Sequence, residues 1–219
     1  MSAWDAGKQA VLEAAKRMSE RGFVVGTSGN ISMRLEDSKG RDLAAITPTN
    51  LCYDTMCVGD IEIVDFEGQP IEGEHAPSVE TMLHLGIYKA RRKVNAVVHT
   101  HPVFASILAV TGIEIPPILD DQVTYLGGAI KVAEYSLPGS KELVTHVLPA
   151  LGPRNAVILA NHGALAVGRD IAEAFTHCEM LEKTARIFIH ALSLGKVNPV
   201  PAAALEMEQA YFTYLFGDS

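Results

Sequence analysis

Histidines stand at the ends of two short apolar runs, and these runs constrain the fold more than any other feature of the chain. His99 and His101 end the run Asn95-Ala-Val-Val-His-Thr-His101, and His162 follows the run Asn155-Ala-Val-Ile-Leu-Ala-Asn. Runs of this length and composition predict buried strands. Residues i and i+2 of a strand point to the same face, so the imidazoles of His99 and His101 converge. With His162 from another strand they would form a three-nitrogen site with one open position, the layout of a catalytic zinc.

A lone His-X-His pair is more often part of a core or a surface than of a metal site. The parallel placement of His162, at the tip of a second apolar run, favours the metal site here. Zinc suits three imidazoles, although other divalent metals bind similar sets.

Helical and strand-like segments alternate along the chain without a regular βαβ order. Helical spacing of apolar residues predicts helices over residues 5–21, 78–92, 103–110, 140–151, 171–194 and 202–215. Strand-like pieces fall at residues 23–25, 30–34, 43–47, 61–65, 129–133, 155–160 and 164–167. This pattern favours an α/β fold with a mixed sheet and helices on both faces over a doubly wound parallel sheet. With no internal repeat and no linker, we expect one domain over residues 1–219.

Composition and charge exclude several classes of protein. The 219 residues are 48% hydrophobic and carry a net charge of −8, which argues against a nucleic-acid partner. The basic run Lys89-Ala-Arg-Arg-Lys93 ends an expected helix, where cations complement the helix dipole. No signal-peptide core or membrane-length apolar run is present, so we expect no membrane partner. The three cysteines lack a disulfide spacing, and reduced thiols in a cytoplasmic protein are the simplest interpretation.

Two loops have the composition of an anion cradle. Gly26-Thr-Ser-Gly-Asn30 follows one strand-like piece, and Thr47-Pro-Thr-Asn50 ends another. Glycines among small hydroxyl and amide side chains let backbone N–H groups line an anion-sized hollow. Either loop alone could be an ordinary tight turn, but two in one chain favour a phosphate or carboxylate site.

The segment Ser78-Val-Glu80 is predicted to open a helix with Ser78 as its N-cap. Free N–H groups at such a helix start would lie near a bound anion. Glu80 in the first turn could simply complement the helix dipole. Beside a three-histidine metal, a carboxylate is also what proton transfer at a polarised carbon requires. His84 lies one turn further on the same helix face, and we interpret it either as a residue that supports the site from behind or as a packing residue.

Taken together, these motifs resemble the class II aldolase/adducin head family, and within it the sugar-phosphate aldolases of the L-fuculose-1-phosphate type. The motifs Gly26–Asn30, Thr47–Thr49, Ser78–Glu80, His99–His101 and His162–Gly163 occur in the family's order and spacing. The resemblance extends from about residue 8 to residue 195. It implies a three-layer α/β/α fold with a central mixed, largely antiparallel sheet. It also implies a homotetramer with zinc sites near the subunit interfaces.

The resemblance assigns roles to individual residues. His99, His101 and His162 correspond to the zinc ligands, and Glu80 to the acid that moves a proton at the substrate carbon beside the carbonyl. Phosphate-binding positions fall on Thr27, Gly29, Asn30, Thr49, Asn50 and Ser78. A second acid or base, expected from a neighbouring subunit, falls near Asp121 or Tyr125. The implied reaction is reversible cleavage of a (deoxy)ketose 1-phosphate, such as L-fuculose 1-phosphate, to dihydroxyacetone phosphate and a small aldehyde.

The chain departs from the family pattern at two positions that concern the substrate. Asn50 stands where a glycine is usual, and Val79 replaces a serine, so one hydroxyl that would face a phosphate is missing. Two alternatives stay open. A sugar-phosphate epimerase, decarboxylase or dehydratase could use the same residues on the same scaffold. A non-catalytic module like the adducin head would keep the fold without the chemistry.

Overall fold

The apolar runs form the central strands of an eight-stranded sheet in the computed structural model, which describes residues 4–217. The strands are β1 (Asn30–Glu36), β2 (Asp42–Ile46), β3 (Glu62–Asp65), β4 (Pro70–Glu72), β5 (Ala96–Thr100), β6 (Val132–Ala133), β7 (Ala156–Leu159) and β8 (Gly163–Gly168). Their order across the sheet is β4-β3-β2-β1-β5-β8-β7-β6. Only the β6–β7 pair is parallel, which confirms the expected mixed, largely antiparallel sheet.

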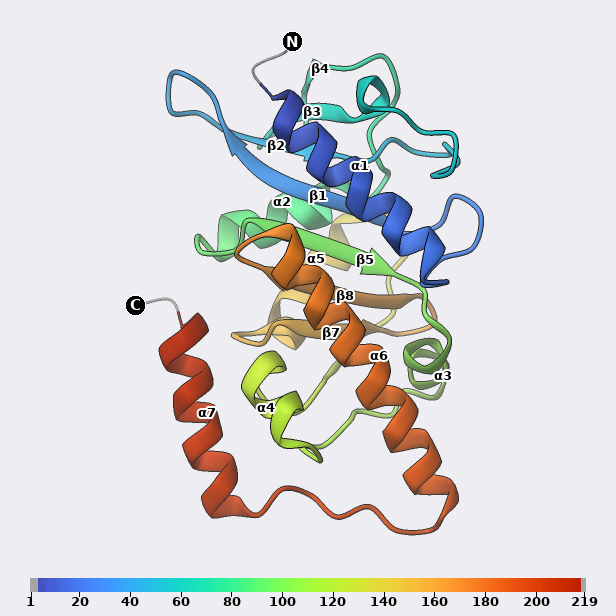
Figure 1. Cartoon of the computed structure of the whole chain (residues 1–219), viewed down its shortest axis with the longest axis vertical. Helices are drawn as coiled ribbons and strands as arrows, with labels where there is room; N and C mark the ends of the chain where they lie inside the picture. The colour runs from blue at the N-terminus through green and yellow to red at the C-terminus, as the bar shows by residue number, and fades with distance from the viewer. Residues whose placement is uncertain (1–3, 218–219) are drawn as a thin grey trace.

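Helices cover both faces of this sheet (Figure 1). They are α1 (Asp5–Glu20), α2 (Thr81–Ala90), α3 (Val103–Thr111), α4 (Asp120–Leu126), α5 (Lys141–Leu151), α6 (Ile171–Ser193) and α7 (Ala202–Phe216), with a short 3₁₀ turn η1 (Val58–Asp60). Helices α1, α3 and α6 pack on one face, and α2 and α5 on the other. The fold is therefore the expected three-layer α/β/α sandwich.

Alternation along the strands divides the apolar side chains between two cores. In β5, Ala96 and Val98 face α1 and α6, whereas Val97 faces α2 and α5. The same alternation places Ala164 and Ala166 of β8 on the first face and Leu165 on the second. Because successive side chains of a strand point to opposite faces, this assignment also decides where the polar residues at the strand ends lie.

Several local elements differ from the sequence-based expectation. Residues 23–25 form a bend and irregular chain instead of a strand, and β4 and α4 were not predicted. Helix α2 begins at Thr81 with Glu80 as its N-cap residue, so the prediction of Ser78 as N-cap is wrong. The Ser78 backbone N–H donates to the carbonyl of Thr47, and its hydroxyl accepts from the N–H of Glu80. The first of these bonds ties the Ser78 backbone to the strand side of the connection, and the helix begins three residues later.

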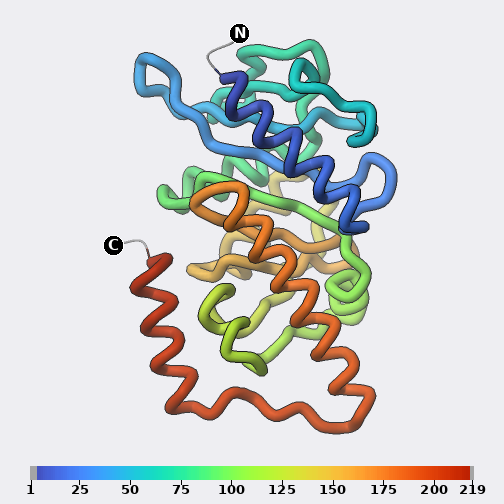
Figure 2. Tube along the Cα trace, viewed as in Figure 1, coloured from blue at the N-terminus to red at the C-terminus, as the bar shows by residue number. Residues whose placement is uncertain are grey.

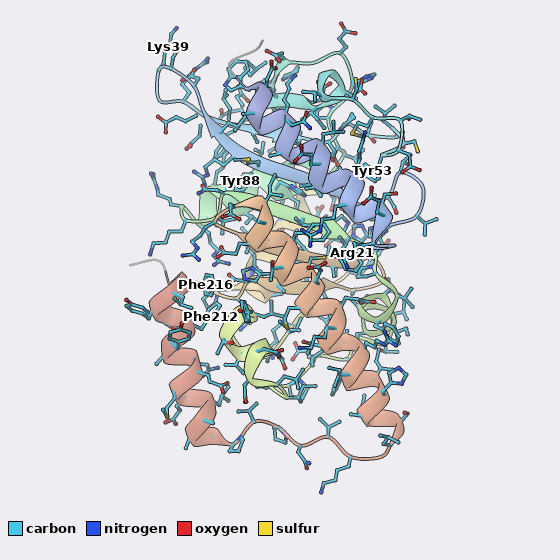
Figure 3. All side chains as sticks on the ribbon, in the orientation of Figure 1. Arg21, Lys39, Tyr53, Tyr88, Phe212 and Phe216 are labelled. Carbon is cyan, nitrogen blue, oxygen red and sulfur yellow. The ribbon has the colours of Figure 1, made fainter. Side chains whose placement is uncertain are left out.

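The C-terminal helix lies apart from the sheet, along the edge of the molecule. An extended segment after α6 runs across the bottom of the view in Figure 2 and leads into α7. Phe212 and Phe216, both labelled in Figure 3, are buried, and α7 packs against α4. Among the described residues, no helix combines the length and the apolar character that crossing a bilayer requires.

Candidate functional site

Three imidazoles converge where β5 ends. His99 lies two residues after Val97 in β5, so its side chain points to the same face of the sheet, the face that carries α2. His101 follows two residues later, just beyond the end of the strand. His162 comes from the turn between β7 and β8, where Asn161 adopts a left-handed conformation (φ 55°). The three ring centroids are 4.7–5.1 Å apart, and one nitrogen from each ring lies within 4.8 Å of the other two. The predicted convergence is present.

A glycine makes room for this arrangement. A Cβ on Gly163 would lie 2.4 Å from the carbonyl oxygen of Thr100 and 2.6 Å from the ring of His101. Any larger residue after His162 would therefore displace His101. The His162-Gly163 dipeptide is thus required by close packing between β8 and the end of β5.

The hydrogen bonds of His99 indicate a metal ligand. Its Nδ1 lies 3.0 Å from the carbonyl oxygen of Ala164, an acceptor, so Nδ1 carries the ring proton and Nε2 is a bare lone pair. That Nε2 lies 2.9 Å from Nε2 of His101. Burial lowers the pKa of His99 to about 4 and also lowers that of His101, so both rings are neutral at pH 7. Neutral imidazoles whose ring nitrogens converge suit a divalent metal such as Zn²⁺.

Glu80 places a carboxylate against these rings. Its Oε2 lies 3.1 Å from Nε2 of His99 and accepts a 2.9 Å hydrogen bond from Nδ2 of Asn30. Its Oε1 lies 3.5 Å from Nε2 of His162. Burial raises the pKa of Glu80, but the two imidazoles and the Asn30 hydrogen bond outweigh it and hold the pKa below its ordinary value. The buried carboxylate is therefore ionised at neutral pH and can accept a proton.

Both predicted cradle loops line one hollow beside these groups. The hollow measures about 420 Å³, a size suited to a small ligand. It is lined by residues from the two loops, the α2 connection and the histidines: Val25, Thr27, Ser28, Gly29, Asn30, Pro48, Thr49, Asn50, Ser78, Val79, Glu80, His101, Pro138 and His162. No lysine or arginine is among these described residues, so hydroxyl, amide and backbone groups would have to bind an anion there.

Two backbone N–H groups expected in the cradle are already used. The N–H of Thr49 donates to the carbonyl of Ala76, and that of Ser78 to Thr47. What the two residues offer to the hollow is therefore their side-chain hydroxyls. Asn50 lies in the left-handed region (φ 57°), which a residue other than glycine adopts at a cost in free energy.

Tyr53 supports the first loop and was missed by the sequence reasoning. Its buried hydroxyl lies 2.5 Å from the carbonyl oxygen of Gly29 and 3.1 Å from that of Ser28, and it is labelled in Figure 3. Gly29 itself has φ 73°, and a Cβ there would lie 2.7 Å from the carbonyl oxygen of His99. No local pattern identifies Tyr53, because it lies 24 residues from Gly29 in the sequence.

Asp121 and Tyr125 do not line the hollow of their own chain. Both lie on α4, where the carboxylate of Asp121 pairs with Lys183 of α6. The ring of Tyr125 lies 6.4 Å from that of His177 and is partly exposed. Within one chain, the structure thus brings together the histidines, Glu80 and the cradle loops, but not these two residues.

Comparisons with known proteins agree with this geometry. The family model for the Class II Aldolase and Adducin N-terminal domain matches residues 9–189. A 5-deoxy-D-ribulose 1-phosphate aldolase of Bacillus thuringiensis serovar kurstaki is 34% identical over 199 residues, 91% of this chain and 92% of that protein. An L-ribulose-5-phosphate 4-epimerase of Salmonella paratyphi B is 31% identical over 205 residues, 88% of this chain and 89% of that protein.

A solved structure of an L-fuculose 1-phosphate aldolase superimposes with a TM-score of 0.89 and 32% identity, covering 97% of this chain and 98% of the other. The family model covers most of the residues, and the solved structure has the same fold over nearly the whole chain. The motifs that resemble the family lie together around one hollow. The chain belongs to the class II aldolase and adducin N-terminal domain family.

Proposed function

We propose that the chain is a divalent-metal-dependent aldolase. It would reversibly cleave a (deoxy)ketose 1-phosphate, such as L-fuculose 1-phosphate, to dihydroxyacetone phosphate and a small aldehyde. The observation that carries this proposal is the ionised carboxylate of Glu80, held 3.1 Å from His99 at the wall of a hydroxyl-lined hollow. Proton transfer at a carbon next to a polarised carbonyl needs a base in this position.

His99, His101 and His162 would hold the metal, and Zn²⁺ is the first candidate for three imidazoles. When bound, such an ion acts as a Lewis acid and stabilises the negative charge that develops on the substrate's oxygens. The bare Nε2 lone pair of His99 and its Nδ1 bond to Ala164 support this assignment.

Glu80 would move the proton at the carbon of dihydroxyacetone phosphate that is bonded to the aldehyde carbon in the uncleaved substrate. In the direction of synthesis, its carboxylate removes a proton from the hydroxyl-bearing carbon of dihydroxyacetone phosphate. In the direction of cleavage, it returns a proton to the same carbon. The low pKa of Glu80 and the hydrogen bond from Asn30 favour the charged form that synthesis starts from.

The cradle loops would hold the phosphate end of the substrate. The assigned residues are Thr27, Gly29, Asn30, Thr49, Asn50 and Ser78, and all six line the hollow. Their neutral hydrogen-bond donors, together with the apolar side chain of Val79, suit a small ligand with one anionic end. Among the substrates of its relatives, a deoxyketose 1-phosphate that yields a short aldehyde such as lactaldehyde or acetaldehyde is the preferred candidate.

A partner subunit would supply the second acid or base, and Asp121 and Tyr125 are the candidates. Neither reaches the hollow of its own chain, so either would act on a neighbouring site in a homotetramer. Exposed apolar side chains support such an interface: Val103, Ile107 and Val110 recur along α3, which begins directly after His101 and Pro102. A cytoplasmic location stays a prediction from the sequence.

An epimerase acting on a ketose phosphate is the second candidate, favoured by the 31% identity to an L-ribulose-5-phosphate 4-epimerase. Such an enzyme would break and remake the same kind of carbon–carbon bond. A decarboxylase or dehydratase would use the same metal and carboxylate. The products separate these activities: a free aldehyde, an epimer, or carbon dioxide.

The test is a retro-aldol assay on zinc-loaded protein with fuculose, 5-deoxyribulose and methylthioribulose 1-phosphates. Release of dihydroxyacetone phosphate is coupled to NADH oxidation, and Glu80→Gln is the control. Release that disappears in that variant supports the aldolase. With zinc confirmed bound, no release from any substrate contradicts it for these compounds and favours an epimerase or decarboxylase. Failure to bind a divalent metal would instead favour a non-catalytic, adducin-like module.

A further inference from the structure

A row of polar contacts joins β1 to α2 directly behind Glu80. Residues 30, 32 and 34 alternate along β1, and residues 80, 84 and 88 follow one another at four-residue spacing along the helix. Asn30 donates to Glu80 at 2.9 Å, and the hydroxyl of Ser32 lies 2.7 Å from Nδ1 of His84 and 2.6 Å from the hydroxyl of Tyr88. Arg34 then donates to the Tyr88 carbonyl at 2.5 Å.

The repeat follows from backbone geometry. Four residues of a helix rise about 6 Å, and two residues of a strand advance about 6.6 Å. Side chains at these intervals therefore stay opposite one another along the crossing. We call Asn30, Ser32, Glu80, His84 and Tyr88 the polar row. Ser32 and His84 are completely buried, beside the apolar side chains that pack on the same face of the sheet.

Hydrogen-bond donors in the polar row define the tautomer of His84. Within the described contacts, the Tyr88 hydroxyl has the Ser32 hydroxyl as its side-chain partner. If Tyr88 donates to Ser32, then Ser32 donates to Nδ1 of His84, and both hydroxyl protons are bound. The reverse direction leaves the Tyr88 proton without an acceptor, which is costly in a buried site. With the first direction, His84 carries its ring proton on Nε2.

Glu80 is the charged member of the polar row. Nε2 of His84 and Oε1 of Glu80 are both buried without a hydrogen-bond partner among the described residues, and they belong to residues one helical turn apart. Burial lowers the pKa of His84 to about 3, against the opposing effect of the Glu80 charge, so the ring is neutral at pH 7. A neutral N–H dipole can orient a carboxylate without neutralising it.

We propose that His84 is a positioning residue: held as its Nε2–H tautomer by Ser32 and Tyr88, it directs an N–H dipole to Glu80 and, with Asn30, fixes the orientation of that carboxylate. This inference rests on the proposed function for its catalytic consequence. The tautomer and its coupling to Glu80 do not depend on which reaction the site performs.

The first measurement is a long-range ¹H–¹⁵N spectrum of the histidine rings at pH 7. We expect a neutral Nε2–H tautomer for His84, assigned with His84→Gln. In Glu80→Gln the Nε2–H proton resonance moves upfield, because the charge it faces is gone. An Nδ1–H tautomer, or a resonance that Glu80→Gln does not move, overturns the proposal whatever the enzyme's activity.

The second measurement compares His84→Leu with His84→Gln in the aldolase assay. We expect His84→Leu to lower kcat about 10–100-fold, because the Glu80 carboxylate loses a dipole that orients it, with KM and bound zinc unchanged. His84→Gln keeps an N–H donor and should recover most of kcat. Equal kcat values in wild type and His84→Leu, or an equal loss in both variants, would contradict positioning by the N–H group.

The chain contains a matched control. Ser136 and His146 form a second serine–histidine pair, with 2.8 Å between the hydroxyl and Nδ1, outside the hollow. His146→Leu should leave kcat within about twofold of wild type at any temperature where the protein is folded. A loss of kcat as large as that of His84→Leu would show that the effect is not specific to His84. An inactive wild type with the Nε2–H tautomer intact would refute the proposed reaction alone.

Discussion

The two faces of the sheet differ in what lies between strand and helix. Under α1 and α6 the layer is apolar, with Ile31, Val98 and Phe175 at its centre. Under α2 the same strands present polar groups at the equivalent depth, among them Ser32 and His99, both completely buried. The apolar layer gains stability from burial alone. The polar layer requires each group to find a partner, and those partners are the groups that build the site.

Strand alternation produces this difference. Thr100 stands between His99 and His101 in the sequence, yet it faces α6 and contacts Cys178 at 3.3 Å. A shift of one residue in β5 would send both histidines into the apolar layer. The site therefore depends on register as much as on residue identity, and variants on the two faces should have very different consequences.

The largest effect is expected from removing a metal ligand. His101→Ala leaves two imidazoles, which bind Zn²⁺ far more weakly than three, so both bound zinc and activity should fall to background. Elemental analysis of the dialysed protein measures the metal, with circular dichroism as the control for folding. Zinc retained at about one per chain would refute the three-histidine site.

Glu80→Gln should lower kcat by about 10²–10⁴-fold, the usual contribution of a general base. Zinc content should stay that of the wild type, because the three imidazoles remain. Measuring kcat from the release of dihydroxyacetone phosphate, together with the zinc content of the same sample, separates catalysis from metal binding. A variant with near-wild-type kcat would remove Glu80 from the mechanism.

Asn30→Ala removes the 2.9 Å hydrogen bond to Glu80 while leaving the metal ligands in place. Hydrogen bonds to charged groups contribute about 1.5–3 kcal/mol, so kcat should fall about 10–100-fold. Asn30 also lines the hollow, so KM for the phosphorylated substrate is measured in the same series. A change confined to KM would show that the amide serves the phosphate instead of Glu80.

The stability of the metal-free protein should fall as the pH falls below about 6.5. The pKa of His84 is about 3 in the folded protein, below its ordinary value of 6.5, because of burial. The unfolded chain therefore takes up a proton that the folded chain does not, and this costs at most about 1.4 kcal/mol per pH unit between these values. Urea unfolding of wild type and His84→Gln from pH 7 to pH 4 checks this, and parallel curves would contradict it.

The smallest effect is expected from Thr100→Val, although Thr100 adjoins two proposed metal ligands. The substitution removes the contact with Cys178 in the apolar layer, and the free energy of unfolding should change by less than about 1 kcal/mol. Zinc content and kcat should stay within about twofold of wild type. A large loss of either would mean that the two faces are not independent.

The sequence predicted the parts of the site that depend on local periodicity. The i, i+2 spacing of His99 and His101 predicted their common face. The composition of the glycine-rich loop predicted an anion cradle, and the family resemblance assigned that loop to the same site. Apolar spacing also predicted most helices and central strands. The three imidazoles each stand at the end of an apolar run, and with Glu80 in the family's order they sufficed to identify the cluster.

The parts that failed depend on contacts distant in the sequence. Ser78 does not cap α2, because its backbone pairs with Thr47, and no helix signal encodes that pairing. Tyr53 supports Gly29 from a separate segment. The sequence left open whether His84 supports the site or only packs, since only the structure shows its contact with Ser32 on β1.

The most direct test of the account is solvent exchange into dihydroxyacetone phosphate. In D₂O, the zinc-loaded protein should incorporate one deuterium at the hydroxyl-bearing carbon without any aldehyde present, as followed by ¹H NMR. Glu80→Gln with the same zinc content should exchange at the background rate. Absence of exchange in the zinc-loaded wild type, or equal exchange in both proteins, would contradict the claim that Glu80 moves that proton.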